Sequence, residues 1–591
     1  MFSKAAYQSK DLLKEQIRAA RSEIDCDLVI KNSRFLDVYS GEFLSGDVAI
    51  HNGYIIGTRE SYKGKKEIDA GGSYLVPGFI DSHVHIESSM MTPVRFQQSV
   101  LPCGTTSVFW DPHEIANVKG ANGIRWALNA SEGLDLDVFV MVPSCVPSTS
   151  PAMGLETSGF ELGLADIEEF RNHPRVLGLA EMMNFPGLLM GDEDVVSKLD
   201  SFQGLKRDGH CPGLSGKDLN AYAAAGIHSC HESTSFEEAK EKMQKGFNVL
   251  IREGSCAKDA RQLLPLVNAY SSAILALCSD DRNPLDIAEE GHISFIINLA
   301  LKSGIAPEDI FRVSSFAAAR SYGLEDRGVI APGYLADFVL VDTVENGKWT
   351  SGMTIREVYK KGKLIDRDEL KRAAQDQIVL DGSLNMNLDS VTDKDFLVAT
   401  NAKDKQPVKV IGVIPRQIVT ENLEATLKVE GGKVLADIET DVLKIAVFER
   451  HHRSGRKGIG FVKGFGLKGG AIATSVNHDS HNAIVVGAND QAMVVALNRL
   501  KEIDGGVVVV GPQGQLEELA LPYGGLMTGI EPEAIAGRLK ALKELAVSLG
   551  CQLEEPFITL SFLALPVIPS LKITDRGLVD VEQFSLVEVL N

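Results

Sequence analysis

The chain has 591 residues, which is too long for a single hydrophobic core and predicts about three or four domains. With 44% hydrophobic and 24% charged residues, its composition is that of a soluble globular protein. The formal net charge of −20 argues against binding to nucleic acid or to an anionic membrane surface.

Targeting signals and cysteine usage favour a cytoplasmic protein. Residues 1–25 are predicted to form a charged amphipathic helix with Leu12, Leu13, Ile17 and Ile24 on its apolar side. They lack the apolar segment of a secretory signal. No stretch of the sequence approaches the roughly 18 apolar residues of a membrane span. The eight cysteines are scattered and form no C-x-x-C pair, which fits reduced thiols better than a disulfide framework.

Two separated segments, residues 26–76 and 324–380, have the short β patterns of an incomplete domain. The strand patterns are Cys26–Lys31, Gly46–Ile50, Tyr54–Gly57, Gly328–Asp342 and Thr354–Lys363. Neither segment has enough strands to bury a core alone. We therefore expect the two segments to fold together as one discontinuous small β-sandwich domain.

Between these flanks, residues 77–323 alternate short apolar runs with helical segments. The runs are Tyr74–Ile80, Thr106–Trp110, Val138–Val142, Val176–Ala180, a weak run before His210, Ile227–Cys230, Asn248–Ile251 and Ala273–Cys278. The helical segments include Asp194–Asp200, Lys217–Ala225, Phe236–Lys245 and Ala257–Tyr270. Eight such units in about 245 residues predict an α/β fold of the (β/α)₈ TIM-barrel type. A doubly wound open sheet would show the same alternation.

Polar residues follow nearly every one of these runs, which favours the barrel. His83 and His85 alternate along an extended strand, so their imidazoles point to the same side. The other residues at strand ends are Asp111, His113, Glu181, His210, His231, Glu253 and Asp280. In a barrel the carboxyl ends of the strands form one ring, and we expect these side chains to converge there. For His113 and Glu253, a role as ordinary loop residues is an equally good interpretation.

Four histidines and two carboxylates in this ring form a ligand set for two divalent metal ions about 3.5–4 Å apart. The predicted ligands are His83, His85, Glu181, His210, His231 and Asp280. Glu181 ends an apolar run, where an unpaired acid would be costly, and is the candidate to bridge the ions. Metal binding lowers the pKa of water from about 15.7 to about 7, giving a hydroxide nucleophile at neutral pH. Asp280 is placed to take the proton of this hydroxide and pass it to a leaving group.

These residues resemble the amidohydrolase superfamily. The resemblance rests on F-I-D-S-H-V-H at 79–85, on Glu181, His210, His231 and Asp280, and on a later G-x-x-x-x-G-Y-x-A-D at 328–337. Many members of the superfamily have a carboxylated lysine where this chain has Glu181. With Glu181 in place of that lysine, the chain is similar to the bacterial adenine deaminase family over essentially its whole length. The similarity also rests on F-W-D-P-H-E at 109–114, C-S-D-D-R at 278–282 and the cluster at 478–482.

The resemblance implies a hydrolase of purine salvage that converts adenine to hypoxanthine and ammonia. It implies a binuclear metal centre of manganese or iron, with zinc as an alternative, and catalytic roles for Asp280, Glu181 and Asp111. We also expect a homo-oligomer, with a dimer as the first expectation.

The last region, residues 395–591, is predicted to form an extra α+β domain. Its strand runs and one long helix are Val408–Val413, Thr426–Val429, Lys444–Glu449, Gly505–Gly511 and Pro532–Leu549. The polar loop His478–Asn482 provides Asp479 and His481, which we expect to help bind or enclose adenine together with His113 and Glu253. A solvated turn far from the metal ions is the alternative for this loop.

Other functions fit parts of the pattern. An amidohydrolase that cleaves a cyclic amide or an N-acetyl C–N bond would use the same metal centre and differ only in its pocket. A non-catalytic scaffold on a decayed barrel would not need the complete ligand set. The H-x-E and P-C-x-x-C pattern of cytidine and tRNA-adenosine deaminases is incomplete in this chain, because residue 106 is a threonine where the second cysteine belongs.

Overall fold

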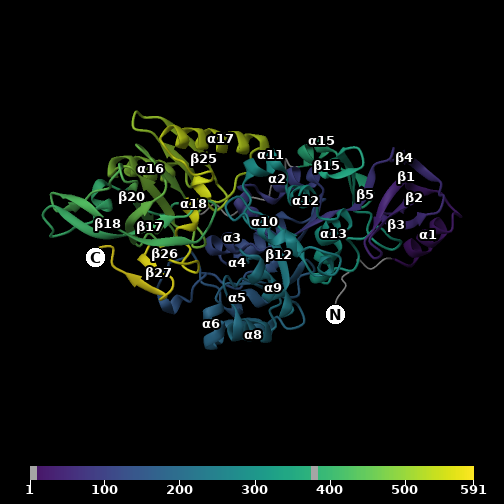
Figure 1. Ribbon diagram of the computed structural model, residues 1–591, viewed down its shortest axis with the longest axis horizontal. Coiled ribbons are helices and arrows are strands. Elements are labelled where there is room, and N and C mark those ends of the chain that lie inside the picture. The colour runs from purple at the N-terminus through teal and green to yellow at the C-terminus, as the bar shows by residue number, and fades with distance from the viewer. Residues whose placement is uncertain (1–8, 374–383) are drawn as a thin grey trace.

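The computed structural model describes residues 9–373 and 384–591. Figure 1 shows three regions in a row: a sheet with α1 (Lys10–Ala20) at one end, parallel strands in the middle, and a C-terminal sheet at the other end. Residues 1–8 of the predicted N-terminal helix and residues 374–380 of the predicted second flank lie outside the described residues. Within the described ranges, no helix combines the length and the apolar character needed to cross a membrane.

The two flanks of the middle region pair in one eight-stranded sheet, in the order β16-β15-β14-β5-β1-β2-β3, with β4 beside β1. Its strands are β1 (Cys26–Asp37), β2 (Glu42–His51), β3 (Tyr54–Arg59), β4 (Gly64–Asp69), β5 (Tyr74–Pro77), β14 (Phe338–Glu345), β15 (Lys348–Lys360) and β16 (Lys363–Leu364). β5 joins the flanks, because it pairs with β1 on one side and with β14 on the other. α1 begins after Ser9, whose side chain accepts a hydrogen bond from the Leu12 N–H at 3.2 Å.

The predicted strand Tyr74–Ile80 is two strands in the structure. β5 belongs to the flanking sheet, whereas β6 (Phe79–Val84) is the first of the parallel strands. Gly78 separates them, and its N–H donates to the Asp337 carbonyl oxygen at 3.0 Å. A Cβ at Gly78 would lie 2.4 Å from Thr106 Oγ1. Only glycine therefore lets the chain pass this close to the neighbouring strand.

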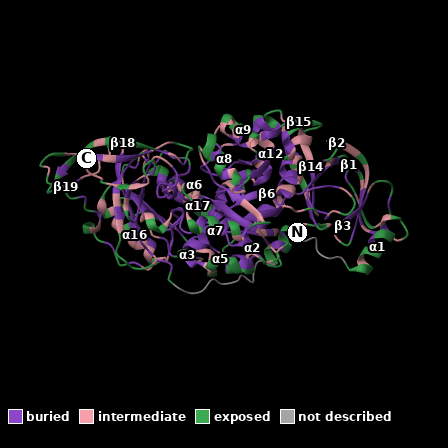
Figure 2. Ribbon diagram, turned by 90° about the horizontal axis from the view of Figure 1, so that it is seen from below, coloured by how far each residue is buried: buried purple, intermediate pink, exposed green. Residues whose placement is uncertain are grey.

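The middle region is a mixed α/β fold that contains a five-stranded and a three-stranded parallel sheet, in the orders β10-β9-β8-β7-β6 and β11-β12-β13. The strands after β6 are β7 (Thr105–Trp110), β8 (Asp137–Val142), β9 (Val176–Met182), β10 (Lys206–Gly209), β11 (Ser229–Cys230), β12 (Asn248–Arg252) and β13 (Ala276–Cys278). β6 is buried along its length and lies among buried residues in Figure 2. The first strand lies beside the end of the last, because the Asp280 N–H donates to the His83 carbonyl oxygen at 3.0 Å.

Helices connect these strands. Three of them, α7 (Glu193–Ser201), α8 (Gly216–Ala224) and α9 (Phe236–Gln244), form within a residue of their predicted bounds. The predicted helix over Ala257–Tyr270 forms only in part, because α10 covers Ala260–Leu263 and a 3₁₀ turn covers Leu264–Leu266. Pro265 follows and has no N–H to continue the helix. Asn268 Oδ1 then accepts the N–H of Tyr270 at 3.0 Å, which forms a turn instead.

The C-terminal region is built on a nine-stranded sheet in the order β19-β18-β17-β21-β20-β23-β22-β24-β25. These strands are β17 (Lys405–Val413), β18 (Thr420–Glu430), β19 (Lys433–Val434), β20 (Val442–Phe448), β21 (Lys457–Lys463), β22 (Ala471–Thr474), β23 (Ala483–Gly487), β24 (Gly506–Val510) and β25 (Leu516–Ala520). Alternate residues of a strand face opposite sides. Val508 accordingly packs in one cluster with α16 (Asp490–Glu502), and Val509 packs in another with α17 (Pro532–Ser548).

The cluster that contains α17 also contains residues of the middle region, so the two regions share a core. Trp110 and Trp126 of the middle region belong to it, together with Leu539 of α17. The Thr528 N–H donates to the Met90 carbonyl oxygen at 2.8 Å across the same boundary. The C-terminal region is therefore packed directly against the end of the parallel strands.

A cluster of charged side chains connects the parallel strands to the flanking sheet, and we expect it to stabilise the fold. Asp137 Oδ2 lies 2.6 Å from both Arg327 Nη1 and Lys360 Nζ. Burial would raise the pKa of Asp137, but these two cations lower it overall. We expect Asp137→Asn to reduce the free energy of unfolding by about 3 kcal/mol at pH 7, because one partner of a buried ion pair is lost.

Urea unfolding of both proteins measures this effect, with exposed Asp135→Asn as the matched control. The depressed carboxyl pKa stabilises the fold above the unfolded-state value of about 3.9. The difference between wild type and variant should therefore shrink as the pH falls below about 4. A difference that stays constant down to pH 3 would contradict this assignment.

Candidate metal and substrate site

The carboxyl end of β6 brings His83 and His85 together. Both rings face the same space, and their Nε2 atoms lie 3.1 Å apart. The Nδ1 of His85 lies 3.0 Å from the Asp111 carbonyl oxygen, so Nδ1 carries the proton and donates it. The Nε2 atom of His85 is thereby left as the one that can bind a metal ion.

Glu181 of β9 lies between two pairs of histidines. Its Oε1 lies 3.4 Å from His83 Nε2 and 3.3 Å from His85 Nε2. Its Oε2 lies 2.7 Å from His210 Nδ1 and 3.3 Å from His231 Nε2. Burial alone would raise the pKa of Glu181, but the charges of His231 and His83 hold it well below its usual value. The carboxylate therefore presents one oxygen to each pair.

Asp280 follows β13 and has different partners for its two oxygens. Oδ1 lies 3.4 Å from His83 Nε2 and 3.2 Å from His85 Nε2. Oδ2 accepts a hydrogen bond from Arg252 Nη1 at 3.1 Å. Burial would raise the pKa of Asp280, but the neighbouring His83 and His85 rings hold it well below its usual value.

Glu232 and Arg252 extend this cluster, and sequence reasoning missed both. Glu232 Oε1 lies 3.4 Å from His231 Nε2 and pairs with Arg252. The Arg252 side chain is 1% exposed and also pairs with Asp259 at 2.8 Å. A signal was present, because Glu232 directly follows His231 and Arg252 ends an apolar run. A buried cation at such a position requires carboxylate partners.

Asp111 and His113 lie beside Glu181. His113 Nδ1 lies 3.0 Å from Asp111 Oδ2 and 3.5 Å from Glu181 Oε1. Its Nε2 lies 3.9 Å from Asp479 Oδ1. Burial lowers the pKa of His113, but the Asp111 carboxylate outweighs it and the pKa rises to about 10. The ring is therefore a cation at neutral pH.

The loop between β22 and β23 brings residues of the C-terminal region into the same space. His478 stacks on Phe562 of α18 (Pro556–Phe562), with ring centroids 4.4 Å apart and an interplanar angle of 5°. His478 and Asp479 line the space, whereas His481 does not. The His481 Nδ1 instead accepts the Asn477 N–H at 3.2 Å, and its Nε2 lies 3.8 Å from Glu114 Oε2.

A second buried cluster, also missed from the sequence, lies behind His478. The Ser88 hydroxyl lies 3.0 Å from Glu114 Oε1 and 2.5 Å from Asp281 Oδ1. One hydroxyl proton can serve only one of these two carboxyl groups. Burial raises the pKa of Glu114 to about 8.

Glu253 is not brought into this cluster. Its Oε2 accepts the Ala260 N–H at 3.0 Å, and its side chain lines a neighbouring cavity instead. Burial raises the pKa of Glu253 to about 7. Of the residues predicted to contact substrate, His113 and Asp479 reach the central space, and His481 and Glu253 lie outside it.

The donor atoms at this centre fit a metal site. Histidine and carboxylate donors form sets of three or four whose atoms lie within 4.8 Å of one another, and every member is buried. Three of these sets are His83 with His85 and Asp280, His83 with Glu181 and His231, and His210 with His231 and Glu232. The Nε2 atoms of His210 and His231 have no hydrogen-bond partner among the described residues. Buried imidazole and carboxylate donors together suit divalent zinc, manganese or iron.

The space enclosed by these side chains is small. It measures about 20 Å³, which is room for a water molecule but not for a ring system. Metal-site residues line it together with the apolar side chains of Met183, Ile418, Phe562 and Leu565. The space is only partly enclosed by these side chains.

Two family profiles match separate segments of the sequence. The profile described as the amidohydrolase family matches residues 74–365, which contain every predicted metal ligand. The profile described as the adenine deaminase C-terminal domain matches residues 417–585, which contain His478, Asp479 and Phe562.

Known proteins match the chain over nearly its whole length. It is 47% identical over 576 residues to the adenine deaminase of Brucella anthropi, and this alignment covers 98% of this chain and 100% of that protein. It is 47% identical over 562 residues to adenine deaminase 1 of Rhizobium meliloti, which covers 95% of this chain and 97% of that protein.

Solved structures match part of the chain. An enamidase structure aligns at a TM-score of 0.41 with 18% identity, and the alignment covers 57% of this chain and 95% of the enamidase chain. A dihydropyrimidinase from Brevibacillus agri aligns at a TM-score of 0.41 with 16% identity, and covers 57% of this chain and 94% of its own.

Proposed function

Because the chain belongs to the adenine deaminase family, we propose that it hydrolyses adenine to hypoxanthine and ammonia. The observation that carries this proposal is the position of Glu181, with one oxygen toward His83 and His85 and the other toward His210 and His231. This arrangement supports two metal ions rather than one, because each oxygen of the Glu181 carboxylate faces its own pair of histidines and can bind one ion.

Two divalent ions are the proposed cofactor, with manganese or iron favoured and zinc as an alternative. When bound, such ions lower the pKa of water and polarise the substrate. His83, His85 and Asp280 would hold one ion, His210 and His231 the other, and Glu181 both. Glu232 and Arg252 would fix the ligands, because Arg252 pairs with Glu232 and with the Oδ2 of Asp280.

Asp280 is the proposed proton carrier. Its Oδ1 faces the candidate metal-ligand histidines, while its Oδ2 accepts a hydrogen bond from Arg252. Replacing the amino group of adenine by a carbonyl oxygen takes both protons from the attacking water: one reaches ring nitrogen N1 and the other reaches the departing amino group, which leaves as ammonia. Asp280 would carry the second of these protons from the water to the amino group.

The purine would lie between the metal ligands and the C-terminal loop. The groups available to its ring nitrogens are the His113 cation, held by Asp111, and the side chains of Asp281, His478 and Asp479. Phe562 stacks on His478 and would give the ring system an apolar and aromatic neighbour. These contacts would distinguish adenine from a cyclic amide at the same metal centre.

The two parallel sheets are proposed to be arcs of one closed (β/α)₈ barrel. The Ser229 hydroxyl donates to Asp208 Oδ1 at 2.5 Å across the gap between β10 and β11. At the other junction, the His85 N–H donates to the Asp280 carbonyl oxygen at 3.3 Å. Closure would bring the carboxyl ends of all these strands to one ring, where the candidate ligands lie.

Ammonia release from adenine by protein loaded with manganese or iron tests the proposed function. We expect close to two metal ions per chain by elemental analysis, and loss of both metal and activity after chelation. Readdition of the metal should restore both. Hydantoin and dihydrouracil, as cyclic amides, serve as control substrates. Turnover of these compounds without turnover of adenine, or full activity in metal-free protein, would contradict the proposal.

Asp479 tests whether the C-terminal loop takes part in binding. We expect Asp479→Asn to keep its metal content and to raise KM for adenine about tenfold, because a hydrogen bond to a charged group is worth about 1.5–3 kcal/mol. Asp389→Asn is the control, since this carboxylate lies in the same region and is 74% exposed. Unchanged kinetics in Asp479→Asn would place the loop outside the reaction.

The prediction of a homo-oligomer, with a dimer as the first expectation, stays a prediction. Light scattering coupled to size-exclusion chromatography at several protein concentrations tests it directly.

A further inference from the structure

Asp259 directly precedes α10, but its side chain does not cap that helix. Aspartate at this position usually accepts a hydrogen bond from an N–H of the first helical turn, and the Asp259 carboxylate makes no such bond. Its Oδ2 instead accepts hydrogen bonds from the Arg252 Nε at 3.1 Å and from the Arg252 Nη2 at 2.8 Å. The carboxylate therefore serves Arg252 rather than its own helix.

A short turn brings Asp259 beside Arg252. Arg252 is the last residue of β12, and the chain reverses directly after it, because Glu253 and Lys258 pair as in an antiparallel sheet. Arg252 and Asp259 are the next two residues outward from this pair. They therefore lie opposite each other across the turn.

The Arg252 guanidinium is held at two edges. Its Nε and Nη2 donate to Asp259, whereas its Nη1 donates to Asp280 Oδ2 at 3.1 Å and pairs with Glu232. A guanidinium is planar and its N–H groups point in fixed directions. The carboxylate at the edge formed by Nε and Nη2 thus determines where Nη1 points, and Nη1 is the donor that reaches Asp280.

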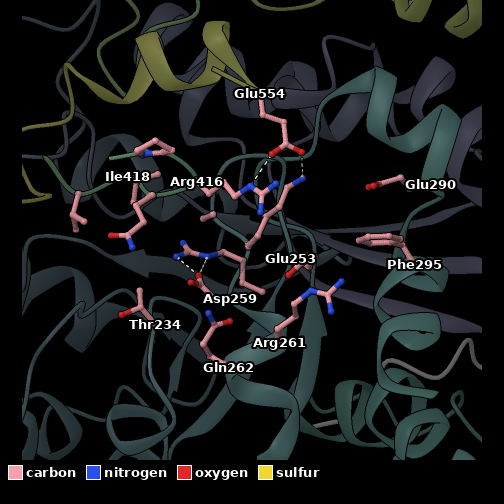
Figure 3. A pocket seen from close by; sticks show the side chains of 16 residues that line it. Thr234, Glu253, Asp259, Arg261, Gln262, Glu290, Phe295, Arg416, Ile418 and Glu554 are labelled. Carbon is pink, nitrogen blue, oxygen red and sulfur yellow. Dashed lines mark hydrogen bonds and ion pairs between the residues drawn. The ribbon is translucent and has the colours of Figure 1, made fainter. Parts of the chain in front are cut away.

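Asp259 and Arg252 also line a cavity of about 490 Å³ beside the metal centre. Figure 3 shows Asp259 in its wall, with dashed lines to the guanidinium that it holds. Arg261 and Gln262, which line the same cavity, are exposed, and the Asp259 side chain is 14% exposed. A small solute can therefore reach the position of the Asp259 carboxylate from this cavity.

We propose that Asp259 is a positioning residue for proton transfer by Asp280 and that it acts through Arg252; the proposal rests on the proposed function. Arg252 holds Oδ2 of Asp280, so it orients this carboxylate with Oδ1 toward the candidate metal-ligand histidines. The orientation of a proton carrier affects the rate of the transfer. Asp259 itself lies outside the lining of the small space and outside the sets of metal-donor residues.

Asp259→Ala removes the carboxylate and leaves Arg252 in place. We expect kcat for adenine to fall about ten- to a hundredfold, because a small misplacement of a reacting group costs up to about 10²-fold. KM for adenine and the metal content by elemental analysis should stay close to those of the wild type. Asp259→Glu, which keeps a carboxylate, should lose less. Glu554→Ala is the matched control and should keep wild-type kcat, because Glu554 lines the same cavity but pairs with Arg416.

Formate gives a measurement that a merely structural role for Asp259 would not change. It supplies the carboxylate that Asp259→Ala removes, and it can reach Arg252 from the cavity. We expect formate to restore most of the lost kcat of Asp259→Ala. Chloride at the same ionic strength should restore none of it, and formate should not raise kcat in the wild type or in Glu554→Ala.

Three results would overturn the positioning role: an unchanged kcat in Asp259→Ala, a loss of kcat that is accompanied by loss of metal, or a loss that formate does not reverse. If Asp259→Ala fails to fold, Asp259→Ser is the second variant, because serine is a favourable residue at the start of a helix. It should show the same selective loss of kcat, and wild-type kcat in it would also overturn the proposal. Failure of the proposed function is distinct, since it would appear as wild-type protein with two metals bound and no turnover of adenine.

Discussion

Glu181→Gln is expected to abolish binding of at least one metal ion and to lower kcat/KM for adenine by roughly 10²–10⁴-fold, because metal charge stabilisation is worth several kcal/mol and each 1.4 kcal/mol is tenfold. The substitution keeps the size of the side chain and removes its charge. Both oxygens of Glu181 face histidines, at distances from 2.7 to 3.4 Å. An amide would turn its NH₂ group, which cannot bind a metal ion, toward one of the two pairs.

Elemental analysis and steady-state kinetics on the same preparation measure both effects of this change. Glu169→Gln is the control, because that carboxylate lies before the same strand and is 53% exposed. A Glu181→Gln protein with two metals and normal turnover would show that the bridge lies elsewhere. Circular dichroism separates a lost fold from a lost metal, since only a lost fold would change the far-ultraviolet spectrum.

Asp280→Asn is expected to lower turnover by about 10²–10⁴-fold, the usual contribution of a general acid–base group. Weaker metal binding should add to this loss, since Oδ1 faces His83 and His85. The neighbour Asp281 is the informative comparison. Its Oδ1 accepts a hydrogen bond from the Ser88 hydroxyl, and Asp281 does not belong to the sets of metal-donor residues that contain His83, His85 and Glu181.

Asp281→Asn should therefore keep both metal ions and act mainly on KM. Metal analysis of the two variants, beside their kcat and KM values, distinguishes the roles. An Asp281→Asn protein that loses turnover as severely as Asp280→Asn, with its metals intact, would mean that proton transfer had been assigned to the wrong residue.

Residues whose environment is set by their own strand could be predicted from the sequence. His83 and His85 face one side because a strand alternates, and Glu181 was notable as an acid in an apolar run. The structure brings both features to one place. The position of Asp280 was predictable for the same reason, because it directly follows an apolar run.

Residues whose partners lie on other strands could not be predicted in this way. Glu232 and Arg252 pair because β11 and β12 are neighbours, and no spacing in the sequence shows that contact. The cluster of Ser88, Glu114 and Asp281 has the same origin. Glu253 was misplaced because a strand-end acid was assumed to face inward, whereas its carboxylate accepts an N–H of the following turn.

The stacked pair of His478 and Phe562 also determines when the protein becomes complete during synthesis. The metal ligands lie between residues 83 and 280, but one wall of the reaction space includes Phe562. A ribosome that stops shortly before this codon, or a protease that cuts there, leaves a chain with every ligand and an open centre. Such a fragment would contain the candidate metal ligands but lack the aromatic side chain that packs against His478 beside them.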